Sequence, residues 1–217
     1  DTTAPAVPGT PSATTPTSDN TPTWSWTAST DGGSGLNATT PYSVQWCTDS
    51  GFTGCAANTA TVSTNSYTHS VALADNTWYF RVLATDAVSN NSAYSSNGSA
   101  LIDTTAPSTV SNLTSSSHAT STWSTDNTID VSWTAATDTG GSGVAGYSYL
   151  FDTSAATTPD TTSDGTATST TSSAQADGNS IYFHVRAIDN VANAGTATHL
   201  GPFYVDTTAP SVPGTPS

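Results

Sequence analysis

The sequence predicts an all-β protein that consists of two tandem, approximately seven-stranded Greek-key β-sandwiches joined by a proline-rich linker. Three observations lead to this fold class: the composition disfavours helices, one motif recurs at the spacing of a sandwich domain, and short aromatic segments alternate between apolar and polar residues. The expected modules comprise residues 1–103 and 104–206. Residues 207–217 are expected to start a further repeat or to form a terminal linker strand.

The composition favours strands and turns over helices. The chain contains no Glu, Lys or Met, so the best helix-forming surface residues are missing. Thr is common in strands, while Ser, Asn, Asp, Gly and Pro are typical of turns. Six Trp, eight Tyr and five Phe supply the large side chains that two cores need, and they argue against a disordered chain.

The motif Asp-Thr-Thr-Ala-Pro sets the predicted domain length. Its three copies begin at Asp1, Asp103 and Asp206, and they are therefore about 100 residues apart, the length of one sandwich domain. Proline fixes φ and pushes the preceding residue into an extended conformation, so each copy is expected to form a stiff junction. The prolines of the first copy recur every third residue, which favours a partly polyproline-like spacer.

Corresponding strands can be found in both modules. Three pairs of segments match: 23–27 with 130–134, 42–46 with 147–151, and 78–86 with 181–189. Period-two alternation in the last pair predicts which residues face the core. That face consists of Trp78, Phe80, Val82 and Ala84 in the first module and Ile181, Phe183, Val185 and Ala187 in the second, with Trp26 and Trp133 opposite.

Two tyrosines are expected on the other face of the same strands. Tyr79 and Tyr182 should point away from the core, beside Arg81 or His184. Exposed rings of this kind can stack on sugars, which would make surface glycans a partner, or they can pack against cross-strand neighbours. The sequence leaves both interpretations open.

The two cysteines are close enough in sequence to close one hairpin-sized loop. Cys47 and Cys55 are expected to form a disulfide, and two free thiols are the alternative. A zinc site would need further Cys or His residues at ligand spacing, and none is nearby in the sequence.

Asp and Asn residues near the module ends are candidate ligands for calcium, which prefers oxygen donors. The equal spacing of two Asp–Asn pairs indicates one repeated turn, and a metal-free turn in which Asp accepts hydrogen bonds from its own backbone is the alternative. The candidates are Asp31, Asp86, Asn90 and Asp103 in the first module and Asp138, Asp189, Asn193 and Asp206 in the second.

Four Asn-x-Ser/Thr sequons offer positions for glycan attachment. They begin at Asn37, Asn90, Asn97 and Asn112. A chain this rich in Ser and Thr also contains several sequons by chance, so they do not by themselves establish glycosylation.

The charge balance excludes nucleic-acid binding. All sixteen acidic residues are Asp and only Arg81 and Arg186 oppose them, which gives a net charge of −14 at pH 7. Phosphate neutralisation requires clustered Lys and Arg, so nucleic acid is not an expected partner. No apolar run approaches the about 20 residues of a membrane-spanning helix, so we expect no membrane insertion within these residues.

No motif in the sequence predicts catalysis. The four histidines, at positions 69, 118, 184 and 199, are scattered, and none belongs to a recognisable nucleophile motif. The Asp residues fall in turns rather than in carboxylate pairs. We therefore expect that the chain is not an enzyme.

The tryptophan of segment 23–27, the aromatic segment 78–86 and the Asp-rich turn that follows it resemble bacterial fibronectin type III-like and immunoglobulin-like repeats of large extracellular surface proteins. The resemblance covers nearly the whole chain. One departure is that Trp78 or Ile181 occupies the position where the family often has the tyrosine of the tyrosine corner.

The resemblance implies an extracellular or cell-surface location and a structural function. The modules would act as spacer and adhesion or assembly elements of an adhesin stalk, surface layer or filament. Their partners would be adjacent repeats or identical subunits, arranged head-to-tail. The alternative is a carbohydrate-binding accessory module of a secreted polysaccharide-degrading enzyme.

Overall fold

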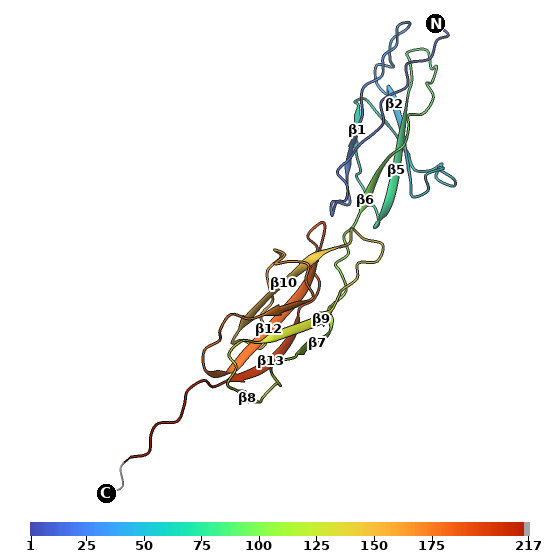
Figure 1. Ribbon diagram of the computed structural model, residues 1–217. Coiled ribbons are helices and arrows are strands. Elements are labelled where there is room, and N and C mark those ends of the chain that lie inside the picture. The colour runs from blue at the N-terminus through green and yellow to red at the C-terminus, as the bar shows by residue number, and fades with distance from the viewer. Residues whose placement is uncertain (215–217) are drawn as a thin grey trace. The chain divides into compact units, whose positions relative to one another are not determined.

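The chain divides into two units, each built from β-strands. A computed structural model describes residues 1–214, and its strands alone make up the regular secondary structure of this range. The first unit contains residues 1–105 together with 140–142, and the second unit contains the remainder. Each unit has one larger and one smaller sheet (Figure 1), so the predicted all-β sandwich fold is confirmed.

The first unit contains six strands in two sheets. The larger sheet has the antiparallel order β3-β2-β5-β6 and the smaller sheet pairs β1 with β4. The strands are β1 (Thr23–Ser25), β2 (Tyr42–Cys47), β3 (Thr59–Val62), β4 (Ser66–Thr68), β5 (Asn76–Ala84) and β6 (Gly98–Ile102).

The first proline-rich segment packs on the first unit instead of acting as a spacer. The N–H groups of Ala6, Gly9 and Ser12 donate to carbonyl oxygens in segment 25–30, at 2.9 to 3.0 Å. The three prolines at positions 5, 8 and 11 are buried and have no N–H to donate. Hydrogen bonds therefore recur only every third residue, which explains why this unit has six strands and not seven.

The second unit contains seven strands in two sheets. The larger sheet has the order β10-β12-β13-β8, in which only β13 and β8 are parallel, and the smaller has the order β11-β9-β7. The strands are β7 (Ser111–Ser115), β8 (Trp123–Ser124), β9 (Asp130–Thr134), β10 (Val144–Asp152), β11 (Ser169–Thr171), β12 (Gly178–Asp189) and β13 (Thr198–Val205). Residues 206–214 form no strand and are exposed, and residues 215–217 lie outside the described residues.

The predicted core face occupies the interior of each sandwich. Trp26 is 4% exposed and Trp133 is 5% exposed, while Phe80 and Phe183 are fully buried. One residue differs from the prediction, because Trp78 lies at the start of β5 and is only partly buried. Its indole N–H donates to the carbonyl oxygen of Ala74 at 2.8 Å.

A buried tyrosine anchors each core in a place that the sequence did not indicate. Tyr42 on β2 accepts a hydrogen bond from the N–H of Ser29 (2.9 Å), and Tyr147 on β10 accepts one from Ala136 (3.1 Å). Each ring also packs edge-on against the core tryptophan of its unit. The two tyrosines are the first residues of the matched segments 42–46 and 147–151, and this match indicates that they occupy equivalent positions.

Candidate functional site

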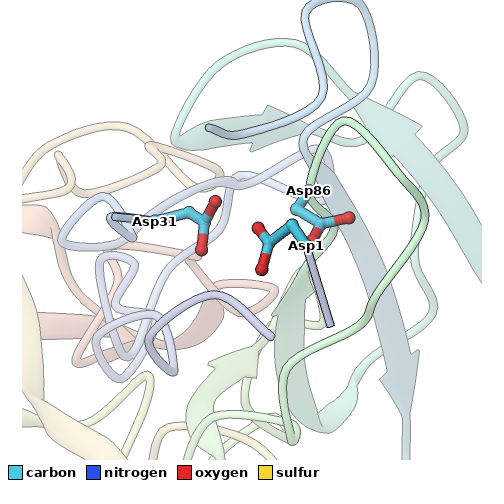
Figure 2. Close-up of side chains that lie close together, drawn as sticks. All are labelled: Asp1, Asp31 and Asp86. Carbon is cyan, nitrogen blue, oxygen red and sulfur yellow. The ribbon is translucent and has the colours of Figure 1, made fainter. Parts of the chain in front are cut away.

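Three carboxylates of the first unit lie close together. Figure 2 shows Asp1, Asp31 and Asp86, and one oxygen of each lies within 4.8 Å of the others. Asp1 is exposed, Asp31 is half-buried and Asp86 is buried. Hard cations such as calcium prefer carboxylate oxygens, so these three residues are candidate ligands, and calcium binding here stays a prediction.

The glycine loop after β1 holds two of these carboxylates. The N–H of Ser34 donates to Asp1 Oδ2 at 2.6 Å, and the N–H of Gly35 donates to Asp31 Oδ2 at 2.7 Å. Gly33 allows the close approach, because a Cβ at that position would lie 2.1 Å from Asp1 Oδ2. Gly35 has a φ of 78°, which favours glycine.

The turn after β5 holds the third carboxylate. Asp86 Oδ1 accepts from the N–H groups of Val88 (3.0 Å) and Asn90 (2.7 Å), and Asp86 Oδ2 accepts from the Asn90 amide (2.7 Å). Burial raises the pKa of Asp86, but hydrogen bonds from Asn90, Val88 and Ser34 outweigh it, so the pKa lies below its usual value. Asp86 is therefore an ionised hydrogen-bond acceptor at neutral pH.

The geometry changes the composition of the predicted calcium set in the first unit. Asp31 and Asp86 are brought together, but their third neighbour is Asp1, which the sequence analysis did not name. Asp1 begins the same motif as Asp103, and this repetition was the signal that could have identified it. Asn90 donates to Asp86 through its amide, so it stabilises the turn.

The candidates of the second unit show the same local turns. Asp189 accepts from the backbone N–H and the side-chain amide of Asn193, at 2.8 and 2.7 Å. Asp138 Oδ2 accepts from the N–H of Gly143 at 2.7 Å. At the module ends, Asp103 and Asp206 each accept from the N–H of the second residue after them. Asp103 is buried and Asp206 is exposed.

A second aspartate in each unit holds the threonines of the repeated motif. Asp75 accepts from the N–H and hydroxyl of Thr104, at 2.9 and 2.7 Å, and from the hydroxyl of Thr105. Asp177 makes the same bonds to residues 207 and 208. The threonine hydrogen bonds lower the pKa of Asp177. We call these two arrangements the linker clamps. An Ala-Asp dipeptide recurs before β5 and β12, and this repeat could have identified the clamps from the sequence.

The structure joins Cys47 and Cys55 in a disulfide. The bridge closes the loop between β2 and β3, and the N–H of Trp46 donates to the carbonyl oxygen of Asn58 across the base of this loop (3.1 Å). The disulfide therefore braces the strand end that carries Trp46.

The four sequons differ in accessibility. Asn97 and Asn112 are exposed, while Asn37 and Asn90 are half-buried. The Asn90 amide is engaged by Asp86, and the Asn97 amide donates to the carbonyl oxygen of Ser50 at 2.9 Å.

The arginine that was expected beside Tyr79 is half-buried on the outer face of β5. Arg81 donates twice to the Gln45 side-chain oxygen, and its guanidinium lies 4.1 Å from the ring centres of both Phe52 and Tyr94. Tyr79 is half-buried, as is Tyr182, whose ring stacks on His184.

Histidines on the outer face of the second unit form a polar row. His184 Nδ1 lies 2.6 Å from His199 Nδ1, and His184 Nε2 lies 3.0 Å from Asp152 Oδ1. Burial, and secondly the neighbouring His184, lower the pKa of His199. His184 is fully buried, although the sequence placed it on an outward face, because His199 and Asp152 cover it. Ser117 Oγ lies 2.9 Å from His118 Nδ1, but His118 Nε2 contacts the backbone carbonyl of Asp126 and not a carboxylate, so this contact lacks the arrangement of a catalytic triad.

An aromatic hollow of about 390 Å³ lies on the first unit. Trp46 from β2, Tyr67 from β4 and Trp78 from β5 line it, together with His69, Asn58 and residues 70–73. The ring centres of Trp46 and Tyr67 are 5.3 Å apart in a stacked arrangement, and His69 packs edge-on against both, with ring centres 4.9 Å apart. We call this feature the aromatic pocket; the sequence analysis missed it because its residues come from four separate segments.

Comparison with known proteins places this chain beside parts of polysaccharide-degrading enzymes. Exoglucanase B of Cellulomonas fimi is 36% identical over 225 residues, which cover 98% of this chain and 18% of that protein. Chitinase A1 of Niallia circulans is 34% identical over 205 residues, which cover 92% of this chain and 26% of that protein. The chain therefore spans only a small part of the length of these relatives. No family model matches it.

Solved structures with similar chains include fibronectin type III domains. A Fn3-like protein from Clostridium thermocellum is 22% identical, with a TM-score of 0.35, over 46% of this chain and 95% of that one. The chicken CNTN1 FN1–FN3 domains are 17% identical, with a TM-score of 0.40, over 94% of this chain and 65% of that one.

Strand order and motif agree in both units. Each larger sheet places the aromatic strand, β5 or β12, between two antiparallel neighbours, and each smaller sheet contains β1 or β9, the strands of the matched segments 23–27 and 130–134. None of the described residues forms a helix long and apolar enough to cross a bilayer. The chain is a tandem array of fibronectin type III-like repeats.

Proposed function

We propose that this chain is a non-catalytic accessory segment of a secreted polysaccharide-degrading enzyme, and that it contacts the polysaccharide. The observation that carries the proposal is the pattern of coverage. An exoglucanase and a chitinase match nearly the whole chain, yet the chain corresponds to 18% and 26% of their lengths. Such a match is expected of a module that accompanies a catalytic domain located elsewhere.

The chemistry of the described residues supports this role. The closest approach to a catalytic arrangement is the row of Asp152, His184 and His199, whose members bond to one another and leave no polarised nucleophile. Partly exposed aromatic rings, by contrast, are suited to flat, neutral sugar surfaces. The disulfide between Cys47 and Cys55 is of the kind that persists in an oxidising, extracellular environment.

Co-sedimentation of the 217-residue chain with insoluble cellulose and chitin tests the proposal. We expect the chain to pellet with at least one polymer, and retention to be nearly independent of salt because the polymers carry little charge. Soluble reducing sugar should not appear. A chain that stays in the supernatant with both polymers, or that releases sugar, would contradict the proposal.

A second candidate function is that of a spacer, and the linker clamps favour it. Asp177 ties Thr207 and Thr208 to the end of the second unit, as Asp75 ties the equivalent threonines to the first. A spacer requires that the chain leave each module in a fixed direction. Amide hydrogen exchange tests this requirement: Thr207 should be protected in the wild-type chain and exchange faster in Asp177→Asn, whereas equal exchange in both would argue against the spacer.

A further inference from the structure

The aromatic pocket of the first unit contains a buried polar atom without a partner. His69 is 4% exposed, and its Nε2 has no hydrogen-bond partner. An unsatisfied buried polar group is costly, and a group of this kind in a native fold requires an explanation. The atom belongs to a residue that lines the hollow, so a molecule in the pocket could supply the missing hydrogen bond.

The second unit shows that the fold does not require this histidine. Tyr67 pairs with Trp24 as Thr170 pairs with Val131, and the N–H of His69 bonds to Pro22 as that of Ser172 bonds to Ile129. Ser172 therefore occupies the position of His69 in the second sandwich. Its hydroxyl accepts from the N–H of Ile129 at 2.9 Å and donates to the carbonyl oxygen of Ser173 at 2.7 Å.

The first unit cannot satisfy His69 in the same way. Pro22 stands where the second unit has Ile129, and proline has no N–H to donate. The other pocket positions also carry different residues in the two units. By strand register, Tyr67, Trp78 and Trp46 of the first unit correspond to Thr170, Ile181 and Phe151 of the second.

The chemistry of the pocket selects an uncharged ligand. Its lining residues carry no Asp or Arg side chain, and burial lowers the pKa of His69 to about 4, so the ring is neutral at pH 7. The chain as a whole has a net charge of −14, which repels anions. Aromatic faces next to neutral donors and acceptors fit a molecule with an apolar ring face and hydroxyl groups at its rim.

We infer that the aromatic pocket binds a sugar residue of a neutral polysaccharide, with Trp46, Tyr67 and Trp78 contacting its ring and His69 Nε2 hydrogen-bonding a hydroxyl. The inference rests on the proposed function and adds the site and the ligand class to it. The disulfide contributes indirectly, because it braces the strand end that presents Trp46 and Asn58.

Isothermal titration with cellohexaose and chitohexaose tests the inference on the 217-residue chain. The informative variants are His69→Ser, Tyr67→Thr and Trp78→Ile, because each introduces the residue that the second unit uses in the same fold. We expect each to weaken binding of the preferred oligosaccharide by about tenfold or more, the effect of one lost hydrogen bond or stacking contact. The control is Trp123→Ala, which removes a 58% exposed tryptophan outside the pocket and should leave affinity unchanged.

The variants must be shown to fold, and near-ultraviolet circular dichroism together with the urea midpoint provides that check. Unchanged affinity in all three folded pocket variants would overturn the inference, as would a wild-type chain that binds neither oligosaccharide. Polymer retention separates the two proposals. If the variants still pellet with cellulose or chitin like the wild type, the pocket is not the contact site, but the accessory function stands. If the wild type binds oligosaccharide but no polymer, the pocket stands and the accessory function fails.

Discussion

Removal of the Cys47–Cys55 disulfide should destabilise the first unit alone. The bridge links residues with a sequence separation of 8. Loop-closure entropy for a loop of this size corresponds to about 2.5 kcal/mol at 25 °C. With a urea dependence of about 1–3 kcal/mol/M, the double variant Cys47→Ser/Cys55→Ser should lower the midpoint of the first unit by about 1–2.5 M.

Urea titration followed by NMR separates the two units within one chain, because tryptophan indole signals report on each core. Trp24 and Trp26 lie in the first core and Trp133 lies in the second. We expect the first two signals to be lost at lower urea in the variant, while the third keeps its midpoint. A midpoint of the first unit that does not change, or an equal decrease in both units, would refute this reasoning.

Four further predictions concern the cores, pH, the linker clamps and metal binding. Trp133→Ala should destabilise the second unit by about 3–5 kcal/mol, and an unchanged urea midpoint would contradict its burial. The folded-state pKa of His69, about 4, lies below its unfolded value of 6.5, so the unfolded state binds the proton first as the pH falls. Stability of the first unit should therefore decrease between pH 6.5 and 4, by at most about 3 kcal/mol, and His69→Ser should abolish this part of the pH dependence. Asp177→Asn should weaken protection of the following threonines and leave the urea midpoint of the second unit unchanged, because the clamp is exposed; a lower midpoint would mean that the clamp also supports the core. Calcium binding by the carboxylates near Asp31 stays a prediction: millimolar calcium should raise the melting temperature of the wild type more than that of Asp31→Asn, and equal responses would contradict it.

The fold could be predicted from the sequence because the signals were local. Alternation on β5 and β12 identified core residues such as Phe80 and Phe183. Because strong helix formers are missing, the sequence did not favour helices over strands. The first proline-rich segment was mistaken for a spacer. Its prolines do prevent a regular strand, but the intervening N–H groups still dock on segment 25–30, and that docking depends on tertiary contacts.

The group of neighbouring carboxylates in the first unit was anticipated only where its residues repeat in sequence, and its binding of calcium stays a prediction. Asp31 and Asp86 recur as Asp138 and Asp189, and they were found, whereas Asp1 was overlooked although it begins the same repeated motif as Asp103. The aromatic pocket could not be found in this way. Its side chains come from four segments, and the second unit has different residues at the corresponding positions. Sequence comparison of the two modules therefore does not reveal the pocket, which becomes apparent only when the strand register is known.

The assignment of polysaccharide contact to the first unit is tested most directly by NMR of the six tryptophan indole groups during titration with cellohexaose or chitohexaose. The indole signals of Trp46 and Trp78 should shift with saturation, because these residues line the aromatic pocket. Those of Trp123 and Trp133 in the second unit should stay in place. Shifts confined to the second unit, or no shift of Trp46 and Trp78 at concentrations where the chain binds the oligosaccharide, would contradict the assignment.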